Sequence, residues 1–155
     1  MRRPVVFSLA IVVLLTSVSV AEEQLTKRQI INRSGPICRD LLEAIQPHIE
    51  KADDAMAKEQ WDRFIREGRR AISTARPYGR ELRSLLPETG ARRYRRFLNH
   101  AREALDRLER ALDALEAERL ELAKSRQQAA REHLARAKRA ARRYGLRRSC
   151  IKVVS

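Results

Sequence analysis

The sequence is poor in the residues that shape turns and sheets. Its 155 residues include five glycines and five prolines, and only 5% of them are aromatic. No glycine or proline occurs between Ala91 and Tyr144, whereas an all-β domain needs a turn roughly every 10 residues. The glycines are also too scattered to form a phosphate-binding loop. These absences exclude a β-sandwich or β-barrel and argue against the common nucleotide-binding folds.

The motifs of common enzymes and cofactor sites are missing as well. The chain has no G-x-S-x-G, H-E-x-x-H or P-loop pattern. Its histidines are His48, His100 and His133, and none follows a glutamate by three residues, as di-iron bundles require. We therefore expect no catalytic residues, no cofactor and no metal site, with the histidines at the surface or at its boundary.

The first 21 residues have the layout of a secretory signal peptide. Two arginines precede a stretch from Val5 to Leu15 that is apolar apart from one serine. The small residues Ser19 and Ala21 then precede Glu22, as at a signal cleavage site. We expect cleavage between Ala21 and Glu22, a secreted or cell-envelope location, and no transmembrane segment after cleavage. The alternative is a retained anchor, although the uncharged stretch is marginal for a span of ~20 residues.

The chain has only two cysteines, Cys38 and Cys150. Export would carry them to an oxidising compartment, where thiols pair. We expect one intramolecular disulfide, with an intermolecular bond or two free thiols as the alternatives. Closing a loop of ~100 residues could stabilise the fold by up to ~4.7 kcal/mol.

The apolar spacing after the signal peptide is helical. We expect a polar lead-in over residues 22–35 and a helical bundle over residues 36–155. Ser34-Gly35-Pro36 has the form of a helix start, and Pro47 should kink or shorten the first helix. Asp53 or Asp54 could cap the second helix.

The second helical run contains the bulkiest apolar cluster, which is Trp61, Phe64 and Ile65. At helical spacing we expect this cluster in the core. The run ends at the turn Pro87-Glu88-Thr89-Gly90, in which Thr89 could cap the next helix.

The stretch from Ala91 to Tyr144 reads as one very long helix or as two antiparallel helices. Arg119 and Arg126 fall where its apolar stripe should continue, and this slip favours two helices with a turn between Glu116 and Gln128. Gly145 has the position of a helix C-cap. The fold class is thus all-α: an antiparallel bundle of four helical segments, or a long helical hairpin, closed by one disulfide.

Positive charge is the strongest signal in the sequence. The net charge is +14, and 28 of the 34 basic residues are arginine. Residues 124–155 hold eleven basic residues and one acid, whereas residues 22–90 are nearly neutral at +1. An amphipathic helix here would carry a basic, possible anion-binding face. Its members, with two residues beyond the helix end, are Arg131, Lys138, Arg139, Arg142, Arg143, Arg147 and Arg148. The alternative is a solvated face whose sign follows the codon usage of a GC-rich genome.

Three short motifs occur together in this chain. They are Ile37-Cys38-Arg39, Leu85-Leu86-Pro87 before the long arginine- and alanine-rich segment, and Tyr144-Gly145-Leu146 shortly before Cys150. With the signal-peptide layout, they resemble small exported helical-bundle proteins of unknown function from high-GC Gram-positive bacteria. The resemblance spans roughly residues 37–150. It implies a disulfide-closed helical bundle and supplies no catalytic residues.

Two functions fit these features. The first is an exported, non-catalytic protein of the cell envelope or extracellular space, with a structural or interaction role. The second is a binder of an anionic polymer, a lipid surface or nucleic acid through the basic C-terminal helix. For the second we favour an anionic envelope polymer or lipid as the partner and do not expect nucleic acid.

Overall fold

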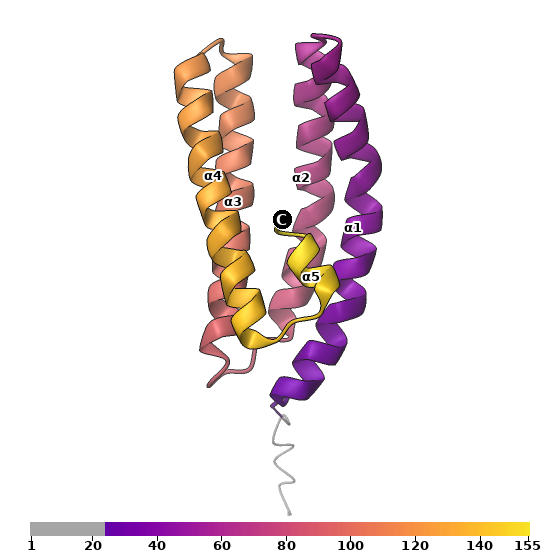
Figure 1. Cartoon of the computed structure of the whole chain (residues 1–155), viewed down its shortest axis with the longest axis vertical. Coiled ribbons are helices and arrows are strands. Elements are labelled where there is room, and N and C mark those ends of the chain that lie inside the picture. Colours follow the sequence, from indigo (N-terminus) through magenta and orange to yellow (C-terminus); the bar gives the residue numbers. More distant parts are fainter. Residues whose placement is uncertain (1–23) are drawn as a thin grey trace, which may run out of the picture.

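Residues 24–155, which the computed structural model describes, form five helices and no strand. The helices are α1 (Lys27–Ala57), α2 (Trp61–Ser84), α3 (Arg92–Glu116), α4 (Leu120–Tyr144) and the short α5 (Arg148–Lys152). α1 and α2 form one antiparallel hairpin, α3 and α4 form a second, and the two hairpins stand side by side (Figure 1). The expected all-α antiparallel bundle with four long helical segments is confirmed. The expected signal peptide, with its cleavage site between Ala21 and Glu22, lies outside the described residues.

The first helix begins earlier than expected. α1 starts at Lys27, so the prediction of a polar lead-in over residues 22–35 is wrong for most of that range. The Thr26 hydroxyl accepts a hydrogen bond from the Gln29 amide at 3.3 Å, and the Gln29 side chain accepts one from the Thr26 amide at 2.7 Å. This capping box satisfies two donors at the helix start. The first turn also buries Ile30, so the early start adds apolar contact.

The first helix also continues farther than expected. Pro36 and Pro47 both lie inside α1, so Pro36 does not start the helix and Pro47 does not shorten it. Both prolines are exposed, and on the solvent side a carbonyl that loses its helical partner can face water. Asp53 and Asp54 therefore lie within α1 and do not cap α2.

The two hairpins turn in the same way. Glu59 between α1 and α2 and Glu118 between α3 and α4 adopt left-handed backbone conformations, with φ of 55° and 57°. In each turn the next amide bonds back five residues to the preceding helix at 2.8 Å. The turn at Glu118 lies inside the expected window from Glu116 to Gln128. The prediction of two antiparallel helices between residues 91 and 144 is thus confirmed.

The remaining helix ends follow the sequence only in part. Gly145 has φ of 90°, and the amides of Gly145 and Leu146 both bond to the last turn of α4 at 3.0 Å, which confirms the glycine C-cap. Thr89 does not cap α3. The N-cap is Ala91, which has no side-chain hydrogen bond to the helix.

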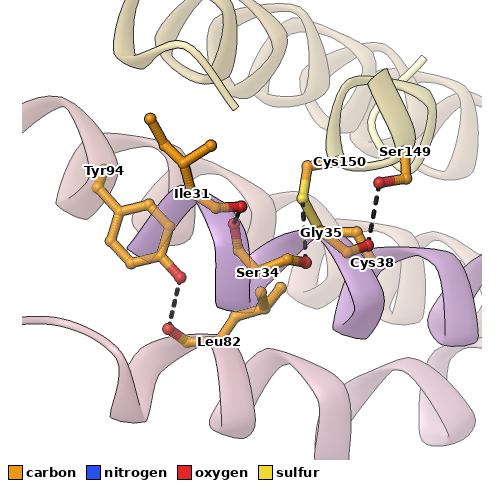
Figure 2. Close-up of a disulfide and its surroundings, with 8 residues drawn as sticks. All are labelled: Ile31, Ser34, Gly35, Cys38, Leu82, Tyr94, Ser149 and Cys150. Atoms are coloured by element: carbon orange, nitrogen blue, oxygen red, sulfur yellow. Dashed lines mark hydrogen bonds between the residues drawn. A yellow bond between two sulfur atoms is a disulfide. The ribbon is translucent and has the colours of Figure 1, made fainter. Parts of the chain in front are cut away.

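The disulfide joins the first helix of the described chain to the last. Cys38 of α1 and Cys150 of α5 form the expected bond, with Cα atoms 4.9 Å apart and a sequence separation of 112. It fastens α5, which follows the second hairpin, onto α1 of the first (Figure 2). Beside it, the Ser149 hydroxyl donates to the carbonyl of Gly35 at 3.0 Å. A Cβ on Gly35 would lie 2.6 Å from Cδ of Arg147, so the glycine lets the Arg147 side chain lie against α1 and a larger residue would displace that side chain.

Two apolar clusters hold the hairpins together. The larger one surrounds the disulfide and includes Tyr94, which is fully buried. The Tyr94 hydroxyl donates to the carbonyl of Leu82 at 2.6 Å and so links α3 to α2 (Figure 2). The smaller cluster joins α2 to α3 nearer the hairpin turns through Ile65, Ile72 and Leu112. The relative position of the two hairpins therefore depends on the α2/α3 contact and on α5.

Candidate anion-binding site

The basic helix α4 is amphipathic, as the sequence predicted. Ala137, Ala141 and Tyr144 of α4 are buried and Leu134 is half-buried, whereas the basic residues lie at exposed or half-buried positions. Spacings of three, four and seven keep side chains on one face of a helix, so the basic residues of α4 form two stripes. The first stripe is Arg136, Arg139 and Arg143, and the second stripe is Arg131, Lys138 and Arg142.

The first stripe faces α3 across a small pocket, which we call the arginine pocket. Its lining residues are Arg93, Arg96 and His100 of α3 and Arg136, Arg139, Ala140 and Arg143 of α4. The cavity volume is about 170 Å³. Within the described chain, five arginines and one histidine line this pocket and no carboxylate does.

Antiparallel packing explains why these residues meet. Two helices that turn at Glu118 bring together residues at equal distances from the turn along the chain. Arg93 and Arg143 are each 25 positions from Glu118, and His100 and Arg136 are each 18 positions from it. Nη1 of Arg93 donates a hydrogen bond to the backbone carbonyl of Arg143 at 3.2 Å, in agreement with this register.

The pocket concentrates positive charge. Among residues 24–155, Arg96, Arg139 and Arg143 form no ion pair, and Arg136 only approaches Glu132, at 3.8 Å. Like charges gathered around one pocket raise the local positive potential. The positive end of the α3 dipole and the negative end of the α4 dipole both lie beside the pocket and oppose each other, so the positive charge comes from the side chains. The arrangement therefore favours an anion between the two helices.

His100 brings a titratable group into the pocket. Its Nδ1 lies 3.3 Å from Nδ1 of His133 on α4, a distance at which one ring donates its N–H and the other accepts. Burial lowers the pKa of His100, and repulsion from His133, Arg136, Arg96 and Arg139 lowers it further. Without a bound anion His100 is therefore neutral at neutral pH.

Five of the seven predicted basic residues lie outside the pocket: the three residues of the second stripe on α4, and Arg147 and Arg148 beyond the end of α4. Nη2 of Arg147 donates to Oδ1 of Asn32 at 3.0 Å, and its side chain covers Gly35. Arg147 thus contributes to the attachment of α5 to α1. Arg148 is exposed at the start of α5.

Sequence reasoning found Arg139 and Arg143 but missed the rest of the pocket. The missed residues are Arg93, Arg96, His100 and Arg136. Their signal was present, because the basic residues of each helix repeat at helical spacing and the two sets lie at nearly equal distances from Glu118 along the chain. It could be used only after the turn had been placed at that residue.

A larger hollow between α2 and α3, of about 710 Å³, has balanced charge. Nη2 of Arg69 lies 2.9 Å from Asp113 and 2.6 Å from Glu116. Along the same interface, Arg76 contacts Asp106 and Glu109 of α3. Pairing with these carboxylates leaves little net field for a ligand.

Other kinds of site receive no support from the described residues. Within positions 24–155, no helix is both long and apolar enough to cross a bilayer. In the same part of the chain, no group of three or more histidine, cysteine or carboxylate side chains is placed to hold a metal ion. The chain matches no protein-family model, no curated protein and no solved structure. A function must therefore be argued from the geometry alone.

Proposed function

We propose that this chain is an exported, non-catalytic helical protein of the cell envelope or extracellular space that binds an anionic polymer through the basic surface of α3 and α4. The arginine pocket carries the proposal, because five arginines converge there from two helices without a carboxylate. Arginines whose charge the fold does not balance are available to an anionic ligand. The disulfide supports the location, because such bonds persist mainly in oxidising compartments.

The basic surface extends beyond the pocket, which favours a polymer over an isolated ion as the physiological ligand. The second stripe runs along α4 beside the first, and Arg92 and Arg95 are exposed on α3. A chain of repeated negative charges can contact several of these groups at once. Such binding releases counterions, so its affinity should fall steeply with added salt.

The test is retention of the exported protein on an immobilised phosphodiester polymer of the teichoic type as the salt concentration rises. The variant Arg139→Gln, Arg142→Gln, Arg143→Gln removes three charges from α4 and keeps good helix formers. We expect it to elute at markedly lower salt than the parent. If the parent is not retained at near-physiological salt, or is retained only by DNA or by anionic vesicles, the proposed polymer ligand is wrong.

A matched control removes the same charge elsewhere. Arg28, Arg33 and Arg80 lie on α1 and α2, are exposed, and make no side-chain hydrogen bond or ion pair within residues 24–155. The triple glutamine variant at these positions should be retained almost as strongly as the parent. Equal loss in both triple variants would mean that net charge alone governs retention.

A further inference from the structure

We propose that the arginine pocket is a discrete site for one phosphate-type oxyanion and that His100 takes up a proton when the anion binds. The inference rests on the proposed function and adds a ligand chemistry and a pH dependence to it. A merely solvated basic surface would have neither a defined stoichiometry nor a linked proton.

The size of the pocket limits its ligand. Its volume of about 170 Å³ far exceeds the roughly 10–15 Å³ that one water molecule needs. It is also smaller than the ~300–1,000 Å³ of sites that enclose drug-sized molecules. The pocket therefore suits a single charged group. That group could belong to a polymer repeat, a lipid headgroup or a free ion, since all three share the same phosphate chemistry.

The arrangement of the guanidinium groups favours a tetrahedral anion. Arg93 and Arg96 form the α3 wall, and Arg139 and Arg143 form the α4 wall. Each guanidinium presents a planar fork that can bind two oxygens of a phosphate or carboxylate. A phosphate group directs oxygens toward both walls at once, whereas a planar carboxylate offers only two oxygens in one plane. Five arginine charges also match a highly charged group better than a single carboxylate.

His100 links the site to pH because of the groups around it. The charged or titratable groups that act on it are Arg96 of α3 and His133, Arg136 and Arg139 of α4, and none comes from α2. All four disfavour an imidazolium, as does burial. An anion in the pocket opposes the field of these positive groups, so the pKa of His100 should rise on binding.

The direction of the pH effect follows from linkage. The pKa of His100 lies below 6.5 in the free protein and higher in the complex, so anion binding takes up a proton between these two values. Affinity should increase as pH falls and level off below the free pKa. One proton per anion changes the affinity by at most about tenfold per pH unit. We expect sulfate to bind about threefold to tenfold more tightly at about pH 5.5 than at about pH 7.5.

The experiment is calorimetric titration of the exported protein with sulfate at constant ionic strength, with the imidazole signals followed by NMR. Sulfate does not titrate over this range, whereas a phosphomonoester has a pKa of about 6 of its own. The expected result is one saturable site per chain, tighter at the lower pH, with a raised pKa for His100. Many weak, equivalent sulfate sites, or a sulfate affinity that does not change with pH, would overturn the proposal. This test needs only the unmodified protein.

Variants locate the site. Arg93→Gln, Arg139→Gln, Arg143→Gln should weaken sulfate binding by at least about tenfold. The control is a triple glutamine variant of the second stripe, which removes the same charge from α4 and should bind within about twofold of the parent. His100→Gln should still bind sulfate but lose the pH dependence. Equal weakening in the first variant and its control would place the anion outside the pocket.

The outcomes separate this inference from the proposed function. Salt-sensitive polymer retention without a single sulfate site would overturn the inference and leave the proposed function standing. A single sulfate site without polymer retention would do the opposite. Competition against bound sulfate by a phosphodiester polymer, anionic vesicles and inorganic phosphate then identifies the source of the group. Failure of all three to displace sulfate would overturn the phosphate assignment.

Discussion

The arginines on the two sides of α3 have opposite surroundings. On the α2 side, Arg69 and Arg76 each contact two carboxylates of α3. On the α4 side, Arg96, Arg139 and Arg143 contact none within residues 24–155. Both groups lie along the same helix, so the arginine richness of the chain does not explain the difference between them.

The difference originates in the order of charges along α3. Residues 92–100 contain four arginines and no acid, whereas residues 102–116 contain five carboxylates. The acidic part lies against arginines of α2, and the basic part lies against the basic end of α4. Codon usage can raise the number of arginines, but it does not exclude carboxylates from one of two neighbouring interfaces. Unbalanced charge that converges between two helices is what a binding site for an anion requires.

The largest expected effect comes from separating the two hairpins. Cys38→Ser, Cys150→Ser should lower the free energy of unfolding by about 2–5 kcal/mol, since the loop it opens is long. The variant should stay helical by circular dichroism. Hydrogen exchange should show α1 and α5 losing protection while α3 and α4 keep most of theirs, and sulfate should still bind. An unchanged denaturation midpoint would mean that α5 does not clamp the hairpins.

The next effect tests the wall of the arginine pocket that sequence reasoning missed. Arg93→Gln, Arg96→Gln should weaken sulfate binding by about tenfold or more, because hydrogen bonds to charged groups contribute about 1.5–3 kcal/mol each. The control Arg92→Gln, Arg95→Gln removes the same charge from exposed positions of the same helix. Calorimetry should separate the two variants. If both variants lose sulfate affinity equally, the affinity depends on net charge and not on the geometry of the pocket.

A smaller effect is expected on the balanced side of α3. Arg69→Gln breaks contacts with Asp113 and Glu116, but the Arg69 side chain is 40% exposed. We therefore expect a loss of only about 0.5–1 kcal/mol in urea denaturation, smaller still at high salt. Sulfate affinity should not change. Arg66, which is exposed and has no partner within residues 24–155, provides the control, and its glutamine variant should match the parent in stability.

The smallest expected effect is on the pH dependence of stability, which should differ between the α2 side and the α4 side of α3. The Arg69 guanidinium holds the pKa of Glu116 below its ordinary value of 4.5, so that pair stabilises the fold fully above about pH 4.5 and less as pH falls through the lower value. The lowered pKa of His100 predicts an earlier loss of stability, beginning as pH falls below about 6.5. Saturating sulfate should offset only the earlier loss. Denaturation at a series of pH values, with and without sulfate, measures both losses of stability. If sulfate offset the loss from the Arg69–Glu116 pair as well, the two sides of α3 would not differ in anion binding.

Much of the fold could be predicted from periodicity and from a few special residues. Helical spacing predicts the bundle, and Gly145 predicts the end of one helix. The two cysteines predict the disulfide. The start of α1 was missed because the Thr26–Gln29 capping box lies in a polar stretch. Trp61 was expected in the core but is 51% exposed, because the turn at Glu59 places it at the end of the hairpin.

The binding site was harder to predict, for a physical reason. A basic stripe on one helix is visible in the sequence as spacing, and Arg139 and Arg143 were found that way. The opposite wall depends on which residues of another helix lie across from it. That register is fixed by the turn at Glu118, a left-handed residue without the usual glycine. Periodicity therefore predicts the faces of helices better than it predicts the pockets between them.

The most direct test follows the arginine side chains themselves. An NMR titration of the protein with sulfate at constant ionic strength, observed at the arginine Nε–H groups, reports on both sides of α3 in one experiment. We predict that the signals of the arginine pocket shift together and saturate with a single binding constant, while those of Arg69 and Arg76 stay in place. Small shifts spread over arginines of both regions, without saturation, would contradict the central claim that unbalanced charge in this pocket forms a binding site.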